Sequence, residues 1–126
     1  LSWAEENMQL NGFTGDQYTY EHADVLQYLD NLKINSYDLV IMDPPTFSNS
    51  KRMKDFLDIQ RDHVTLLNKV LLATKKDGVV YFSNNYRRFV LDEENIEASS
   101  IKDITSQTLP FDFQQKLIRK CYRLTK

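Results

Sequence analysis

An acid, two prolines and an aromatic residue follow one another where an apolar segment of the chain stops. The apolar segment covers residues 39–42, and Asp43, Pro44, Pro45 and Phe47 come after it. A short continuous apolar run indicates a strand buried on both faces of a parallel sheet. The prolines have a fixed φ and no backbone donor, so they end the strand and stiffen the next residues. Ligands of open α/β sheets bind at the carboxyl ends of strands, so this stretch predicts a site for a flat polar group such as a nucleobase.

A structural interpretation of the same stretch stays open. Asp-Pro-Pro after an apolar run can simply end a strand, with Asp43 capping a turn and Phe47 folded back into the core. The residue types alone do not separate the two interpretations.

Amide and basic side chains follow the same predicted strand and the next one. A second apolar run, residues 79–83, is expected beside the first, so polar groups after both runs should meet at one edge of the sheet. Amides there can bond a base edge or cap the loop, and cations there can contact phosphates. The candidate nucleic-acid contacts are Lys51, Arg52, Asn84, Asn85, Arg87 and Arg88.

The sequence around the prolines resembles a known motif. Asp-Pro-Pro-x-Phe after an apolar strand is similar to motif IV of class I S-adenosylmethionine-dependent methyltransferases that act on nucleic acid bases. With residues 46–53, 60–63 and 82–85, the likeness narrows to the K half of the bacterial bifunctional large-subunit ribosomal RNA methyltransferase K/L, a guanine-N7 methyltransferase. It extends from Trp3 to the carboxyl end. The resemblance implies an α/β, Rossmann-like sheet ending in an antiparallel strand pair, S-adenosylmethionine as cofactor and 23S ribosomal RNA, or its large-subunit precursor, as substrate.

The resemblance also implies roles for particular residues. Asp43 and the Pro44 carbonyl would hydrogen-bond the base, Phe47 would stack on it, and Asp24, Val25 and Asp43 would contribute to the cofactor site. Asp24 is equally suited to cap a helix over residues 25–32, and the two roles are compatible.

The expected chemistry needs positioning more than acid–base catalysis. Guanine N7 already has a free lone pair, so neither a general base nor a metal is required. Methylation of an exocyclic amine, as on guanine N2 or adenine N6, stays open because an acid and a proline carbonyl also suit an amino donor. Cytosine C5 methylation is excluded, since it needs a cysteine near the base and Cys121 is predicted in the last strand.

The part of a methyltransferase that holds most of the cofactor is not expected in this chain. Gly12, Gly15 and Gly78 are the only glycines, and their spacing forms no phosphate or adenosine loop. We therefore expect residues 1–126 to form the carboxyl-terminal portion of one domain, with a sheet that lacks its first two strands. Because residue 1 is Leu, we also expect a longer polypeptide whose amino-terminal domains are partners, and an isolated chain that is inactive.

Composition limits the alternatives. The 126 residues are 41% hydrophobic, enough for one core, and contain no run long enough to span a bilayer. One cysteine fits a reducing cytoplasm. The net charge of −2 disfavours a passive RNA-binding module, because phosphate binding depends on Lys and Arg.

The remaining elements follow from periodicity and punctuation. A capping box at Ser2 and Glu5 predicts a helix ending at Asn11 and Gly12. Helical spacing over residues 56–71 predicts another helix, ending near Lys75 and Lys76. His63 lies on the apolar stripe of that helix and is expected to be structural, with no metal site. We further expect strands at 18–25, 101–109 and 117–124, a turn at Asp77 and Gly78, and a short polar helix at 92–99.

Overall fold

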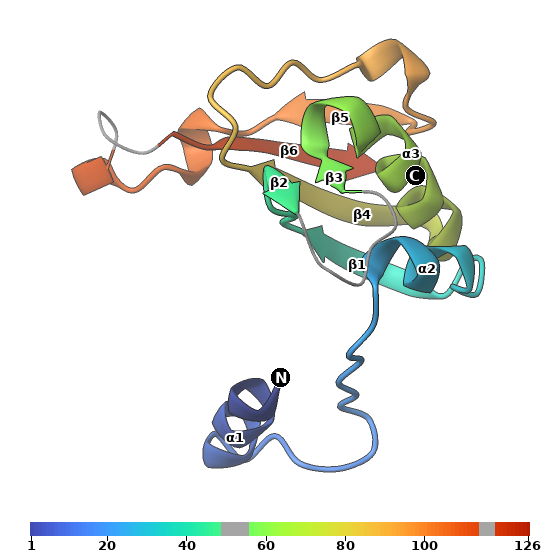
Figure 1. Cartoon of the computed structure of the whole chain (residues 1–126), viewed down its shortest axis with the longest axis vertical. Coiled ribbons are helices and arrows are strands. Elements are labelled where there is room, and N and C mark those ends of the chain that lie inside the picture. The colour runs from blue at the N-terminus through green and yellow to red at the C-terminus, as the bar shows by residue number, and fades with distance from the viewer. Residues whose placement is uncertain (49–55, 114–117) are drawn as a thin grey trace.

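A four-stranded sheet forms the centre of the computed structural model, which describes residues 1–48, 56–113 and 118–126 (Figure 1). Its strand order is β1-β4-β6-β5. The parallel pair is β1 (Tyr37–Met42) and β4 (Thr74–Asn84), whereas β6 (Lys120–Thr125) runs antiparallel to both β4 and β5 (Ser100–Asp103). The mixed α/β sheet and its closing antiparallel pair are therefore as predicted.

Helices α2 (Val25–Asp30) and α3 (Ile59–Ala73) cover one face of this sheet (Figure 1). The apolar positions of α3 recur at helical spacing, so one stripe of the helix meets the inward side chains of β4 and β6. The core formed in this way includes Leu66, Leu67, Val70, Leu71, Val80, Phe82 and Leu124.

The other face of β1 is exposed, which corrects the prediction of a strand buried on both faces. Leu39 is 55% exposed and Ile41 is 74% exposed, whereas Met42 on the helix side is 8% exposed. Among the described residues no strand pairs with the outer edge of β1. A run of apolar residues indicates that both faces of a strand can be buried. It does not indicate that residues of this chain cover the second face.

A small antiparallel ribbon follows the proline pair. It consists of β2 (Phe47–Ser48) and β3 (Leu57–Asp58), with Phe47 opposite Asp58. The Ile59 N–H donates to the Thr46 carbonyl at 3.1 Å, and Leu57 is buried. The ribbon therefore joins the segment after β1 to the start of α3.

The amino-terminal part of the chain differs most from the sequence prediction. Helix α1 (Ser2–Leu10) has no buried residue and lies apart from the sheet at the end of an extended segment (Figure 1). Its N-cap is Leu1, without a side-chain cap, so the capping box predicted at Ser2 is wrong, whereas the predicted end is confirmed by the C-cap at Asn11. The strand predicted at 18–25 is also wrong, because residues 18–24 have no partner strand and Val25 already begins α2.

Other boundaries shift because tertiary contacts override local preference. Helix α3 ends at Ala73, two residues before Lys75, since β4 begins at Thr74 and pairs with β1. The polar helix predicted at 92–99 is only a 3₁₀ turn, η1 (Glu93–Asn95). The strand predicted at 101–109 stops at Asp103, and two further 3₁₀ turns follow, η2 (Ser106–Thr108) and η3 (Phe111–Phe113). None of the described helices is long and apolar enough to cross a bilayer.

Candidate functional site

The ends of β1 and β4 bring Asp43 beside Ser83. Because the strands are parallel and Met42 pairs with Phe82, the next residue of each strand lies at the same edge of the sheet. The Ser83 hydroxyl donates to Oδ1 of Asp43 at 2.7 Å. Asp43 itself is exposed, so its carboxylate is accessible to a ligand and not enclosed in the protein.

Phe47 is presented on the β2–β3 ribbon. Its backbone pairs with Asp58, while its ring is 57% exposed and meets the edge of Tyr86 at 6.3 Å between centroids. Pro44 is half-buried and Pro45 is exposed between this ring and Asp43. The Phe47 ring therefore does not belong to the core.

Asn84 and Asn85 occupy different environments. Asn84 is fully buried, and its Oδ1 accepts the Tyr86 N–H at 3.0 Å, as in a side-chain-capped turn. Its Nδ2 has no hydrogen-bond partner among the described residues. Asn85 is exposed. Of the two roles considered for Asn84, loop capping is the one that its contacts display.

The loop of residues 85–92 carries the basic pair and is held by α3. Gln60 makes two hydrogen bonds with the backbone of Val90, both at 2.9 Å. His63 lies with Nδ1 2.9 Å from the Gln60 carbonyl oxygen, and its Nε2 accepts the Asp92 N–H at 3.1 Å. Both ring nitrogens are thus engaged, which confirms a structural histidine.

Arg87 and Arg88 project from this anchored loop. Both side chains are exposed, and Phe89, the next residue, is buried against His63 at 4.8 Å between ring centroids. The guanidinium groups are therefore accessible to solvent on the loop that follows β4. Lys51 and Arg52, the other predicted phosphate contacts, lie outside the described residues.

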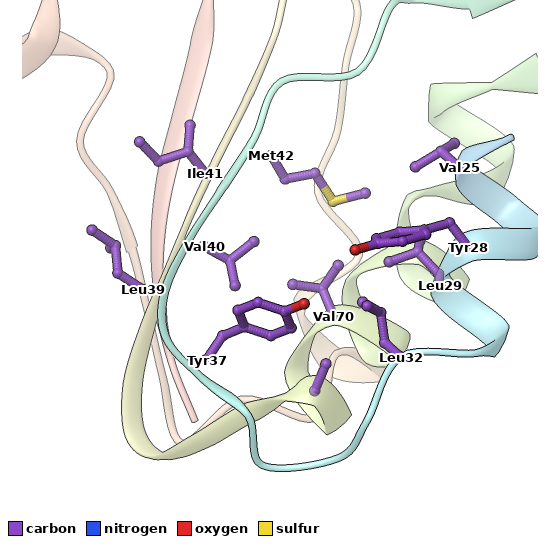
Figure 2. Close-up of a pocket in the computed structure, with 11 residues that line it drawn as sticks. Val25, Tyr28, Leu29, Leu32, Tyr37, Leu39, Val40, Ile41, Met42 and Val70 are labelled. Atoms are coloured by element: carbon purple, nitrogen blue, oxygen red, sulfur yellow. The ribbon is translucent and has the colours of Figure 1, made fainter. Parts of the chain in front are cut away.

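Asp24 caps α2, as one of its two predicted roles requires. Its Oδ1 accepts the N–H groups of Leu26 and Gln27 at 2.9 and 3.2 Å. Val25, the next residue, is 41% exposed and lines an apolar hollow of about 360 Å³ between α2, α3 and the open edge of β1 (Figure 2). Asp43 is not part of that lining.

The side chains that line this hollow are mostly apolar. Tyr28 and Tyr37 are the lining residues with polar side chains (Figure 2). Hydrogen bonding with the Tyr37 side chain raises the pKa of Tyr28, and burial adds to the effect. The lining residues are Val25, Tyr28, Leu29, Leu32, Tyr37, Leu39, Val40, Ile41, Met42, Val70 and Ala73.

Three residues near the site escaped the sequence prediction as functional positions. Ser83 and Tyr86 became relevant through contacts with Asp43 and Phe47, and Gln60 through the loop that it holds. The predicted adjacency of the two strand ends contained the signal for Ser83. Identifying Ser83 as the neighbour of Asp43 also required the register between β1 and β4, which the sequence did not provide.

Comparison with solved structures defines the class of fold. SMU.776, described as a methyltransferase complexed with SAH, superposes with a TM-score of 0.73 at 18% identity, covering 98% of this chain and 35% of that one. A second structure, described as a SAM-dependent methyltransferase from Streptococcus mutans, gives a TM-score of 0.69 at 16% identity. The sheet and its helices thus have the fold of a portion of a SAM-dependent methyltransferase.

Sequence comparison then identifies the particular relatives. The chain is homologous over almost its whole length to ribosomal RNA large subunit methyltransferases K and K/L, which confirms the resemblance seen in the sequence. It is 48% identical over 128 residues to the K/L protein of Vibrio parahaemolyticus and 45% identical over 126 residues to the K protein of Neisseria meningitidis. No family model matches the chain. The alignments cover 99% and 98% of this chain but only 18% and 36% of those relatives.

Proposed function

We propose that the polypeptide carrying this chain transfers a methyl group from S-adenosylmethionine to N7 of a guanine in 23S ribosomal RNA. The observation that carries the proposal is the exposed Asp43 carboxylate at the end of β1, with the exposed Phe47 ring three residues beyond the first proline. Relatives that share almost half of the residues of this chain are named for methylation of large-subunit ribosomal RNA.

The site residues would act by holding the base. Asp43 and the Pro44 carbonyl accept hydrogen bonds from the base, and Phe47 stacks on its face. Such stacking contributes about 1–3 kcal/mol per base, enough to favour a base turned out of its helix. Bound S-adenosylmethionine supplies the methyl group. Because N7 carries a free lone pair, the protein has to align the base and exclude water, and it moves no proton.

This chain fits one part of the cofactor. Asp24 has only Oδ1 in its cap hydrogen bonds, so Oδ2 remains available to the adenine amino group. Val25, exposed beside it, offers an apolar contact for the ring. The rest of the cofactor site, including a glycine loop, would be contributed by an amino-terminal portion of the same domain. Residues 1–126 are then the carboxyl-terminal portion of a class I methyltransferase domain, with a sheet that lacks its first two strands.

The RNA strand would be held by the loops beside the base site. Arg87 and Arg88 are exposed on the loop anchored to α3, and Asn85 is exposed at its start. Lys51 and Arg52 would add contacts from the segment after β2. Asn84 would act through the loop that it caps, since its side chain is buried.

The proposal is tested by mapping the modified nucleotide. Mass spectrometry of 23S ribosomal RNA from a strain lacking the full-length gene should show loss of one 7-methylguanine. The wild-type gene should restore it, and the Asp43→Ala variant should not, although its folding is intact. Asp38→Ala is the matched control, because Asp38 is an exposed β1 acid that pairs with Lys75 at 2.9 Å. Restoration by the Asp43→Ala gene would remove Asp43 from the site.

A second candidate reaction is methylation of an exocyclic amine on guanine N2 or adenine N6. It is favoured by the succession of two hydrogen-bond acceptors, the Asp43 carboxylate and the Pro44 carbonyl, which suit an amino donor. The same mapping discriminates between the two reactions. If this second reaction is the correct one, the strain lacking the gene loses an N2-methylguanine or an N6-methyladenine and keeps its 7-methylguanine.

The isolated chain is proposed to be inactive even if the full-length protein is an enzyme. Calorimetry with S-adenosylmethionine is expected to show no binding to residues 1–126 alone. Tight binding by this chain would contradict the proposal for the isolated chain and leave that for the full-length protein unchanged.

A further inference from the structure

Asp43 has one anchor in the described part of the chain. The hydroxyl of Ser83 donates to Oδ1 at 2.7 Å, and no other hydrogen bond or ion pair of the described residues reaches this carboxylate. The side chain is exposed, so without this bond it would sample several rotamers. One contact therefore restricts the direction in which the acid points.

The anchor is itself rigidly placed. Ser83 is half-buried in β4, which is paired on one side with β1 and on the other with β6, where Cys121 lies opposite it. Backbone pairing on both sides holds the strand, so the position of the hydroxyl is set by the sheet and not by a loop. A hydroxyl that donates to an ionised carboxylate makes one of the stronger hydrogen bonds in proteins.

We propose that Ser83 is the positioning residue for Asp43, holding Oδ1 so that Oδ2 is presented to the target base. This inference rests on the proposed function, in which Asp43 contacts the base. Ser83 touches neither base nor cofactor in this scheme and acts only through the acid. A misplacement of about 1 Å at a reacting group can cost about 100-fold in rate, so orientation by a neighbour matters for a reaction that depends on alignment.

The test uses the full-length protein with ribosomal RNA and S-adenosylmethionine. Ser83→Ala should lower kcat about tenfold, with the dissociation constants of RNA and cofactor and the melting temperature unchanged. Ser83→Thr keeps the hydroxyl and suits a strand, so it should retain most of the wild-type kcat. Ser99→Ala is the matched control, because the Ser99 hydroxyl donates to the Thr125 carbonyl at 3.0 Å at the opposite end of the sheet.

The outcomes separate the two proposals. A wild-type kcat for Ser83→Ala, together with an inactive Asp43→Ala, would overturn the role of Ser83 and leave the proposed function in place. Wild-type kcat values for both variants would overturn the role of Asp43 and, with it, that of Ser83. Equal losses of kcat in Ser83→Ala and Ser83→Thr, or a parallel loss of melting temperature, would make Ser83 a structural residue and also refute the proposal.

Discussion

Asp43 and Phe47 lie close in sequence but are held by different means. A side-chain hydrogen bond from the neighbouring strand orients the carboxylate, whereas backbone pairing with Asp58 places the aromatic ring. Phe47 also meets Tyr86 edge to face, which is a favourable geometry for aromatic rings. Its remaining exposed surface is available for a base. At this scale the site is a set of accessible groups attached to ordered backbone.

Replacement of the Phe47 ring should affect RNA and not cofactor. Loss of stacking in Phe47→Ala is expected to weaken use of the RNA substrate by about 1–3 kcal/mol, measured as kcat/KM for RNA, while cofactor affinity stays at the wild-type value. Phe111→Ala is the control, since Phe111 is 90% exposed in η3. Equal losses for RNA and cofactor would indicate that Phe47 supports the fold instead.

Helix α3 and strand β4 depend on specific backbone and capping contacts at their ends. Helix α3 begins at an N-cap, Asp58, whose carboxylate accepts the Gln60 and Arg61 N–H groups. Asp62 returns the contact by accepting the Asp58 N–H at 2.9 Å. At the other end, β4 leaves its register with β1 between Thr74 and Val79, and this irregularity contains the turn predicted at Asp77 and Gly78. The Asp58 cap therefore lies at the junction of β3 and α3, and the irregular part of β4 follows the end of α3.

The α3 cap makes stability depend on pH. Hydrogen bonding from the Arg61 side chain, with the Asp58 N–H adding to it, holds the pKa of Asp62 below its usual range. Because the folded-state pKa is the lower one, this stabilisation is complete above about pH 4 and is lost as pH falls through the folded-state value. Urea unfolding should show a smaller decrease in stability between pH 5 and pH 2 for Asp62→Asn than for the wild type, since Asn cannot titrate. Identical pH dependences would exclude this contribution.

The irregularity in β4 requires a glycine. A Cβ at Gly78 would lie 2.8 Å from the Lys75 carbonyl oxygen and 2.6 Å from Cγ2 of Thr74. Gly78→Ala should therefore reduce the free energy of unfolding by about 1–3 kcal/mol, because backbone atoms must move. Chemical denaturation measures the change, with the exposed neighbour Lys76→Ala as control. Equal stability of the two variants would show that the segment adapts without cost.

At the scale of the whole molecule, helices cover one face of the sheet, and β1 is left exposed on the other. Helices α2 and α3 cover one side of the sheet (Figure 1). Leu39 and Ile41 are exposed on the other side, and α1 has no buried residue. The alignments cover 18% of the Vibrio parahaemolyticus protein and 36% of the Neisseria meningitidis protein, so those relatives contain much more chain than this one. Because the net charge of these residues is −2, the proposed attraction to RNA would depend on local basic clusters and not on their overall field.

The basic pair should therefore dominate the salt dependence of RNA binding. Removing Arg87 and Arg88 together should weaken binding of the full-length protein to ribosomal RNA and reduce the slope of log affinity against log salt by about 0.7 for each charge. The matched control is Lys76→Ala with Lys102→Ala, two exposed cations at other positions of the sheet. A slope that matches the control would remove Arg87 and Arg88 from the RNA contact.

Local sequence information predicted much of this arrangement. The end of β1 before Asp43, the neighbouring strand β4, the cap at Asp24 and the structural role of His63 follow from apolar runs, proline chemistry and helical spacing. The antiparallel closing strands were expected from the resemblance to class I methyltransferases. These features depend on residues that are close in sequence, or on the rule that the carboxyl ends of parallel strands lie at the same edge of a sheet. They could therefore be inferred without coordinates.

Long-range contacts decided the rest. The Ser83–Asp43 bond joins residues 40 positions apart, and it forms only because β1 and β4 adopt one register. Residues 18–24 form no strand, despite β-prone residue types, because a strand needs a partner for its backbone hydrogen bonds. For the same reason the exposure of Ile41 could not be inferred from its apolar neighbours. Burial depends on which layers are present around a strand, and that is a property of the assembled molecule.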